Sequence, residues 1–191
     1  MKNLKAYSTL VSIMFLAGCV LSLEPFYTKE SVIEMPALNG KWQPADNKGN
    51  PEKNEEPWVF DDDKILTFDK GDSGLLHVTY FSIGGLIFAD TTVHKLQGIN
   101  EWQAIHLMPV HMVSRIEVEG NQLTVRPLNI NWFDDFIQEH PFANSVEIDE
   151  YNTLMVNASS QDWVNFLKKY GADKGAFSEN GAFEFIRQIA E

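Results

Sequence analysis

Histidines and carboxylates are the residues of this chain that could do acid–base or metal chemistry, but their spacing does not assemble a site. His106 and His111 lie five residues apart, so on one strand they would point to opposite faces. Asp134 and Asp135 are adjacent on an expected helix, where carboxylates are usually solvated. No serine stands in a G-x-S-x-G sequence that would present it as a nucleophile. The sequence therefore predicts no enzyme, no metal site and no cofactor. The histidines are His77, His94, His106, His111 and His140.

Three consecutive aspartates, Asp61 to Asp63, form the stretch that most suggests a bound cation. Carboxylate oxygens suit Ca²⁺, but no fixed ligand spacing follows these three residues. Residues 58–60 and 65–68 on either side have strand-like composition. We therefore expect a solvated acidic turn between two strands, and the sequence leaves open whether this turn binds a cation.

Cys19, the chain's single cysteine, follows an apolar N-terminal stretch. Lys2 and Lys5 give the first residues a positive charge, and residues 10–16 (LVSIMFL) are apolar except for one serine. A positive start, a short apolar run and small residues together indicate a secretory signal peptide. The run is too short to span a bilayer, which takes about 20 apolar residues. One interpretation is a cleaved signal peptide followed by a chance cysteine.

The other interpretation rests on the four residues Leu16-Ala17-Gly18-Cys19, which resemble the lipobox of bacterial lipoproteins. The resemblance implies cleavage between Gly18 and Cys19 and acylation of the cysteine, which becomes the anchor. Two or three acyl chains hold a protein firmly at a membrane. Val20 stands where an aspartate retains enteric lipoproteins in the inner membrane. The resemblance therefore implies the periplasmic face of the outer membrane, if the host is Gram-negative.

Length and charge favour one exported domain. Removing residues 1–18 leaves 191 − 18 = 173 residues, which is the usual size of one domain. The net charge is −12, and it becomes −14 after Lys2 and Lys5 are lost. Such a protein repels nucleic acid and anionic membrane surfaces, so acyl chains on Cys19 and not charge would hold it at the membrane. We expect a signal peptide at 1–18, a lipidated tether at 19–37 and a single β-rich domain at 38–191.

Alternating apolar residues predict many short strands. Residues 75–81 alternate, with Leu76, Val78 and Tyr80 on one face. Gly120-Asn121 predicts a tight hairpin turn between strands at 110–119 and 122–126. Further strands are expected at 86–96, 102–108 and 153–156, and helices at 131–138 and 160–170. The tail at 181–190 is ambiguous. This pattern predicts a mainly β fold, an antiparallel barrel or half-open barrel of about eight strands with one or two late helices.

Gly40-Lys41-Trp42 begins the first expected strand of the domain and resembles the G-x-W segment of lipocalins and related calycin barrels. The resemblance implies that Trp42 closes one end of an eight-stranded barrel and that a late arginine packs on it. Arg115 and Arg126 are the candidates for this arginine by their rough position. The alternative is that Trp42 is an ordinary buried aromatic residue at the start of a strand.

Residues 21–38, with the phrase L-x-P-F-Y-T, also resemble the openings of a group of uncharacterised bacterial lipoproteins, which implies no activity. Two hypotheses of function remain. The first is a structural or accessory envelope protein whose barrel-like core is filled by its own side chains, with a possible envelope protein partner. The second is a lipocalin-like binder or carrier of a small apolar ligand. The abundant aromatic residues suit both, as core packing or as cavity lining.

Overall fold

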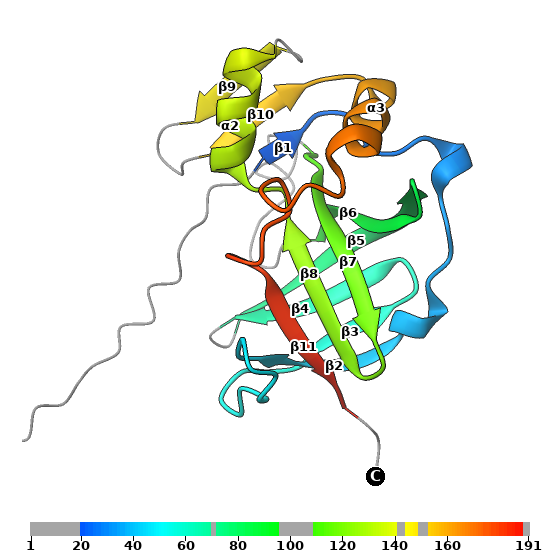
Figure 1. The fold of residues 1–191 in the computed structure, drawn as a ribbon. Coiled ribbons are helices and arrows are strands. Elements are labelled where there is room, and N and C mark those ends of the chain that lie inside the picture. The colour runs from blue at the N-terminus through cyan, green and yellow to red at the C-terminus, as the bar shows by residue number, and fades with distance from the viewer. Residues whose placement is uncertain (1–19, 70–71, 96–108, 141–143, 149–152, 189–191) are drawn as a thin grey trace, which may run out of the picture.

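The computed structural model describes residues 20–69, 72–95, 109–140, 144–148 and 153–188. Eight antiparallel strands close into a barrel in the order β11-β2-β3-β4-β5-β6-β7-β8 (Figure 1). This confirms the prediction of a mainly β fold with an eight-stranded antiparallel barrel, and the barrel is closed rather than half-open. The barrel strands are β2 (Gly40–Ala45), β3 (Trp58–Asp61), β4 (Lys64–Asp69), β5 (Asp72–Ile83), β6 (Leu86–Lys95), β7 (Met112–Glu119), β8 (Gln122–Pro127) and β11 (Phe183–Arg187).

The strand β11 closes the barrel, although the sequence left its segment ambiguous. It pairs with β2 on one side, where Arg187 lies opposite Trp42. On the other side it pairs with β8, where Phe185 lies opposite Leu123. The first and last strands of the domain therefore meet, and the sheet keeps no free edge.

Side chains from all eight strands form one buried apolar cluster inside the barrel. The strands of a closed ring can share one apolar cluster only on the inner face, so the cluster marks the interior. In β5, Val78 and Tyr80 belong to it while Phe81 does not, which confirms the predicted alternation. We call this set the interior cluster: Leu38, Trp42, Phe60, Ile65, Val78, Tyr80, Ala89, Ile116, Leu123 and Phe185.

A second layer covers one end and part of the outer wall of the barrel. It contains a three-stranded sheet of β1 (Val20–Ser22), β10 (Thr153–Asn157) and β9 (Asn144–Ile148), with β1 parallel to β10. The helices α2 (Ile130–Glu139) and α3 (Ser160–Tyr170) lie with it at the top of Figure 1. Asn129 caps α2 and Ser159 caps α3, each accepting a hydrogen bond from a backbone N–H of the first turn. Both helices occur where the sequence predicts them.

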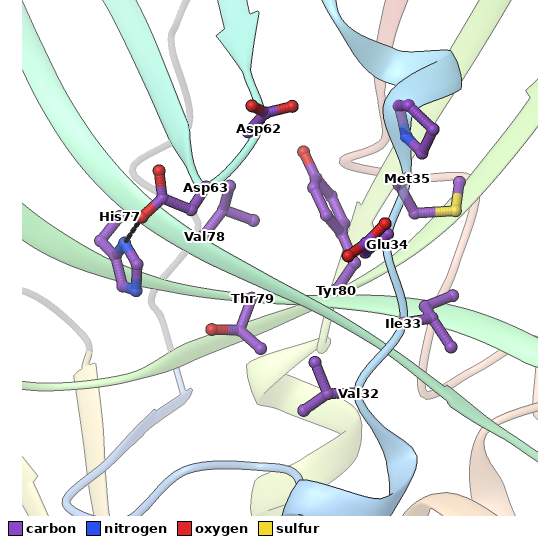
Figure 2. Close-up of a pocket in the computed structure, with 11 residues that line it drawn as sticks. Val32, Ile33, Glu34, Met35, Asp62, Asp63, His77, Val78, Thr79 and Tyr80 are labelled. Carbon is purple, nitrogen blue, oxygen red and sulfur yellow. Dashed lines mark ion pairs between the residues drawn. The ribbon is translucent and has the colours of Figure 1, made fainter.

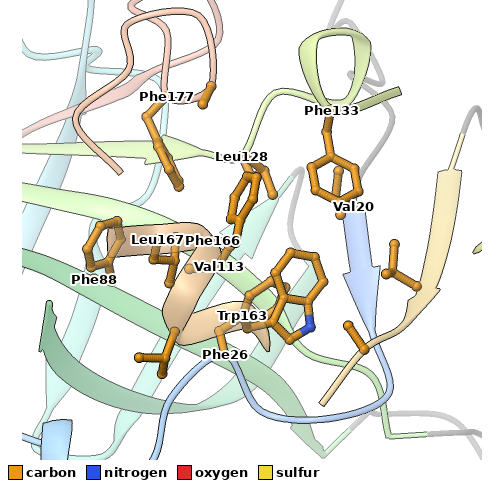
Figure 3. Packing of buried hydrophobic residues seen from close by; sticks show 14 of the residues in the cluster. Val20, Phe26, Phe88, Val113, Leu128, Phe133, Trp163, Phe166, Leu167 and Phe177 are labelled. Carbon is orange, nitrogen blue, oxygen red and sulfur yellow. The ribbon is translucent and has the colours of Figure 1, made fainter. Parts of the chain in front are cut away.

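The second layer is held to the barrel by its own buried cluster, which we call the cap cluster (Figure 3). Phe88 on β6 and Val113 on β7 contribute the outer face of the barrel wall. Trp163 and Leu167 come from α3, and Phe133 from α2. Phe133 and Trp163 stack with ring centroids 5.6 Å apart. The domain therefore has two apolar cores, one inside the barrel and one between the barrel and the helices.

The segment before residue 38 differs from the expected tether. Val20 is 3% exposed and starts β1, where it lies opposite Leu154. Phe26 is completely buried, and its ring lies 4.3 Å from that of Trp163. Residues 20–37 therefore belong to the folded domain, because their apolar side chains complete the cap cluster. The expected tether 19–37 is therefore packed from Val20 onward, and it is not a free linker before residue 38.

The helices give no transmembrane segment: within the described residues, none is both long enough and apolar enough to cross a bilayer.

Candidate functional site

Trp42 lies on β2 inside the barrel, in the part of β2 that pairs with β11. Its side chain is 0% exposed, and its Nε1 donates a hydrogen bond of 2.7 Å to the Leu38 carbonyl. The Arg187 guanidinium lies over the indole, 4.3 Å from the ring centroid. Nη1 of Arg187 also donates to the Asn39 carbonyl at 2.9 Å, and Nη2 donates to the Ala37 carbonyl. The arginine therefore links β11, the last strand of the barrel, to residues 37–39, which come just before β2.

Gly40 allows this arrangement. Its φ of +126° is a conformation that residues with a Cβ rarely adopt. A Cβ built at Gly40 would lie 3.4 Å from Nη1 of Arg187. The conformation of Gly40 therefore lets the chain pass close to the Arg187 guanidinium, which covers the indole of Trp42 two residues later.

Arg115 and Arg126 do not contact Trp42, so the assignment of the late arginine to either of them is wrong. Both form ion pairs with the Glu117 carboxylate. Arg115 also donates a hydrogen bond to the carbonyl of Gly171, which caps the C-terminus of α3. They alternate with the interior residues of β7 and β8 and therefore face outward. Position alone suggested them, whereas Arg187 lies in the tail whose structure the sequence did not define.

The barrel interior near Trp42 is occupied by aromatic rings. Phe60 lies between Trp42 and Phe185, with centroid distances of 6.4 Å to each ring. Trp58, on the same strand as Phe60, packs on Phe185 with ring centroids 5.0 Å apart. These rings pack inside the barrel together with the aliphatic residues of the interior cluster.

A groove with a volume of about 420 Å³ lies in the barrel wall beside β5 (Figure 2). One wall is the segment 32–36, which runs beside the end of β5, where the Ile33 N–H donates to the Tyr80 carbonyl. The opposite wall is the β3–β4 turn, where the Asp63 carbonyl accepts from the Val78 N–H. The groove therefore lies beside β5, between the two segments that hydrogen-bond to it: the β3–β4 turn at Val78 and the segment 32–36 at Tyr80.

Tyr80 is the buried polar residue of this groove. The side chain is 5% exposed and stands between the acidic turn and the segment 32–36 (Figure 2). No described residue forms a hydrogen bond with its hydroxyl. Burial raises the pKa of this hydroxyl above its ordinary value, so it stays neutral at physiological pH. A neutral hydroxyl can both donate and accept a hydrogen bond.

The acidic turn is a structured corner of the groove. Asp62 has a φ of +48°, and its backbone N–H and carboxylate form two hydrogen bonds with the Asn39 side chain. Asp63 contacts Nδ1 of His77 at 3.3 Å and Nζ of Lys64 at 3.6 Å. Within the described ranges, no three His, Cys, Asp or Glu side chains are grouped so that they could hold a metal ion.

The described histidines are spread over the molecule. His111 binds the buried Asp90 carboxylate with its Nδ1 at 2.8 Å, and the other oxygen of Asp90 accepts from the Phe26 N–H. Asp90 therefore links β6 to the N-terminal segment through Phe26 and to the start of β7 through His111. This contact gives His111 a structural role. His140 is exposed and stacks on Phe136.

His77 and His94 lie with ring centroids 6.4 Å apart. His106 and the expected strand 102–108 lie outside the described residues. Gly18 and Cys19, the expected cleavage and lipidation residues, lie outside them as well, and the lipobox stays a prediction.

No protein-family model, no curated protein and no solved structure matches this chain.

Proposed function

We propose that the protein is an extracytoplasmic lipoprotein that is anchored through acyl chains on Cys19 and serves as a structural or accessory protein of the cell envelope. The lipobox-like residues 16–19 support the anchor, and Val20 after the cysteine favours the periplasmic face of the outer membrane. The net charge of −12 makes contact with nucleic acid unfavourable.

The aromatic cluster packed inside the barrel is the observation that supports the accessory role. Trp42, Phe60 and Phe185 are buried there and pack ring against ring. An eight-stranded barrel has an interior that side chains alone can fill, and a carrier must instead keep an apolar lumen open. The buried rings therefore favour a barrel that acts as a rigid platform, with recognition on its outer surface.

A second candidate is a lipocalin-like carrier of a small apolar ligand. One observation favours it: Gly40, Trp42 and Arg187 combine a G-x-W strand start with a late arginine on the tryptophan. A shared way to close a barrel does not by itself determine what the barrel binds.

The anchor is tested with the full-length chain in a Gram-negative host, with and without Cys19→Ala. We expect the wild-type chain to incorporate labelled fatty acid and to enter the detergent phase. The alanine variant should do neither, because the chain has no other cysteine. Val20→Ala serves as the matched control and should keep the label. Lipidation of the alanine variant would refute the proposal.

A further inference from the structure

The groove beside β5 has the features of a binding site for a small cationic ligand. We propose that it binds a primary ammonium group carried on a short aliphatic body. This inference concerns a groove in the barrel wall whose lining includes Val78 and Tyr80 of the interior cluster, and it does not depend on the lipid anchor.

The charge of the groove selects a cation. Glu34 is exposed on one wall, and Asp62 and Asp63 lie on the other. Among the described lining residues there is no lysine or arginine, and the single base is His77. Asp63 contacts His77 and also Lys64 beside the groove, so Glu34 and Asp62 supply the negative charge that would meet a ligand. The whole chain adds a net charge of −12 to this local field. A fatty-acid carboxylate would therefore be repelled, and an ammonium group would be attracted.

Tyr80 is an independent observation that points to a ligand. Its hydroxyl is polar, lies on a side chain that is 95% buried, and has no hydrogen-bond partner among the described residues, while it lines the groove (Figure 2). The residue as a whole is buried, so its hydroxyl can pair only with water or with a ligand that occupies the groove. The phenol oxygen can accept a hydrogen bond from an ammonium, and the electron-rich ring face attracts a cation.

The remaining lining residues suit a short apolar body. Val32 is 44% exposed, which is unusual for a valine, and it lies in the groove with Met35, Pro36 and Val78. The volume of about 420 Å³ is at the low end of the range of about 300–1,000 Å³ for small-molecule sites. A chain of a few methylene groups that ends in an ammonium matches both the apolar lining and the size.

The test compares three ligands with one chain length and different head groups: hexylammonium, hexanol and hexanoate. Calorimetric titration uses residues 19–191 with Cys19→Ser, so that the exported chain purifies without lipid. We expect saturable one-to-one binding of hexylammonium, weaker binding of hexanol and none of hexanoate. Equal binding of all three, or binding of none, would overturn the proposal.

Variants then locate the site. Tyr80→Phe removes one hydrogen bond and should weaken hexylammonium binding about threefold to tenfold. Glu34→Gln should weaken it by a similar factor, because Glu34 is a free carboxylate of the groove rim. Glu119→Gln, which makes the same change at the exposed β7–β8 turn, should leave the affinity unchanged. Equal effects of the two glutamine variants would show a general charge effect and refute the site. Unchanged melting temperatures would verify that the fold is intact.

Discussion

At the scale of single residues, the contact between Arg187 and Trp42 decides how the barrel closes. The two residues are 145 positions apart in the sequence, so no local pattern predicts their contact. Sequence reasoning found Trp42 through its short spacing from Gly40, but it placed the partner at Arg115 or Arg126. The tail offers few apolar residues in a regular order, and its pairing with β2 and β8 exists only in the folded chain.

Replacing Arg187 tests this closure. Arg187→Met keeps the aliphatic stem but removes the cation over Trp42 and the hydrogen bonds to two backbone carbonyls. We expect a loss of about 2–4 kcal/mol in the free energy of unfolding, measured by urea denaturation. Lys41→Met, an exposed change on the neighbouring strand, should cost less than about 0.5 kcal/mol. Similar losses for the two variants would contradict the proposed role of Arg187.

At the scale of elements, most barrel strands and both helices were predictable from their own patterns, and β1, β9 and β11 were not. The hairpin around Gly120-Asn121 and the helix α3 carry their own turn, cap and apolar spacing, and both occur as predicted. By contrast β1 has three residues and β9 and β11 have five. β1 and β11 form because partners far away in the sequence satisfy their backbone groups, and β9 forms by pairing with β10. The groove was unpredictable for the same reason, since its walls are far apart in the sequence.

The N-terminal segment gives a prediction at this scale. Phe26→Ala should cost about 3–5 kcal/mol of unfolding free energy, because the ring is fully buried against Trp163. In a domain of this size such a loss lowers the melting temperature by roughly 6–20 °C. Phe183→Ala is the matched control: that ring is 50% exposed, and its loss should cost about 1 kcal/mol or less. If Phe26→Ala melts like the wild type, the segment is a tether after all.

At the scale of the whole molecule, the packed N-terminal segment limits where the domain can lie relative to a membrane. A flexible tether of residues 19–37 would have a root-mean-square length of about 24 Å, which exceeds the domain's expected radius of gyration of about 16 Å. Val20 is instead fixed in β1, one peptide bond after the proposed lipidated cysteine. Lipidation at Cys19 would therefore hold the end with β1 and α2 against the lipid, with β2 and β11 pointing away (Figure 1).

Single-cysteine labelling tests this orientation. Lipid occupies Cys19 in the anchored protein, so a second cysteine would be its only free thiol. We expect headgroup-attached spin labels to quench a dye at Asn131→Cys, in the first turn of α2, much more strongly than at Lys48→Cys, in the loop between β2 and β3. A glycine–serine linker inserted after Cys19 should reduce the difference. Equal quenching in protein that is verified to be lipidated would contradict the orientation without affecting the anchor.

If side chains fill the barrel, an apolar ligand finds no lumen to enter, so a binding experiment with such a ligand shows whether the interior is filled. Residues 19–191 with Cys19→Ser are titrated with an environment-sensitive fluorescent fatty acid, and melting is followed with and without excess ligand. A filled interior predicts no saturable fluorescence change and an unchanged melting temperature. Saturable one-to-one binding at micromolar affinity, with stabilisation of about 2.7 kcal/mol at a hundredfold excess over Kd, would contradict the account and favour the carrier.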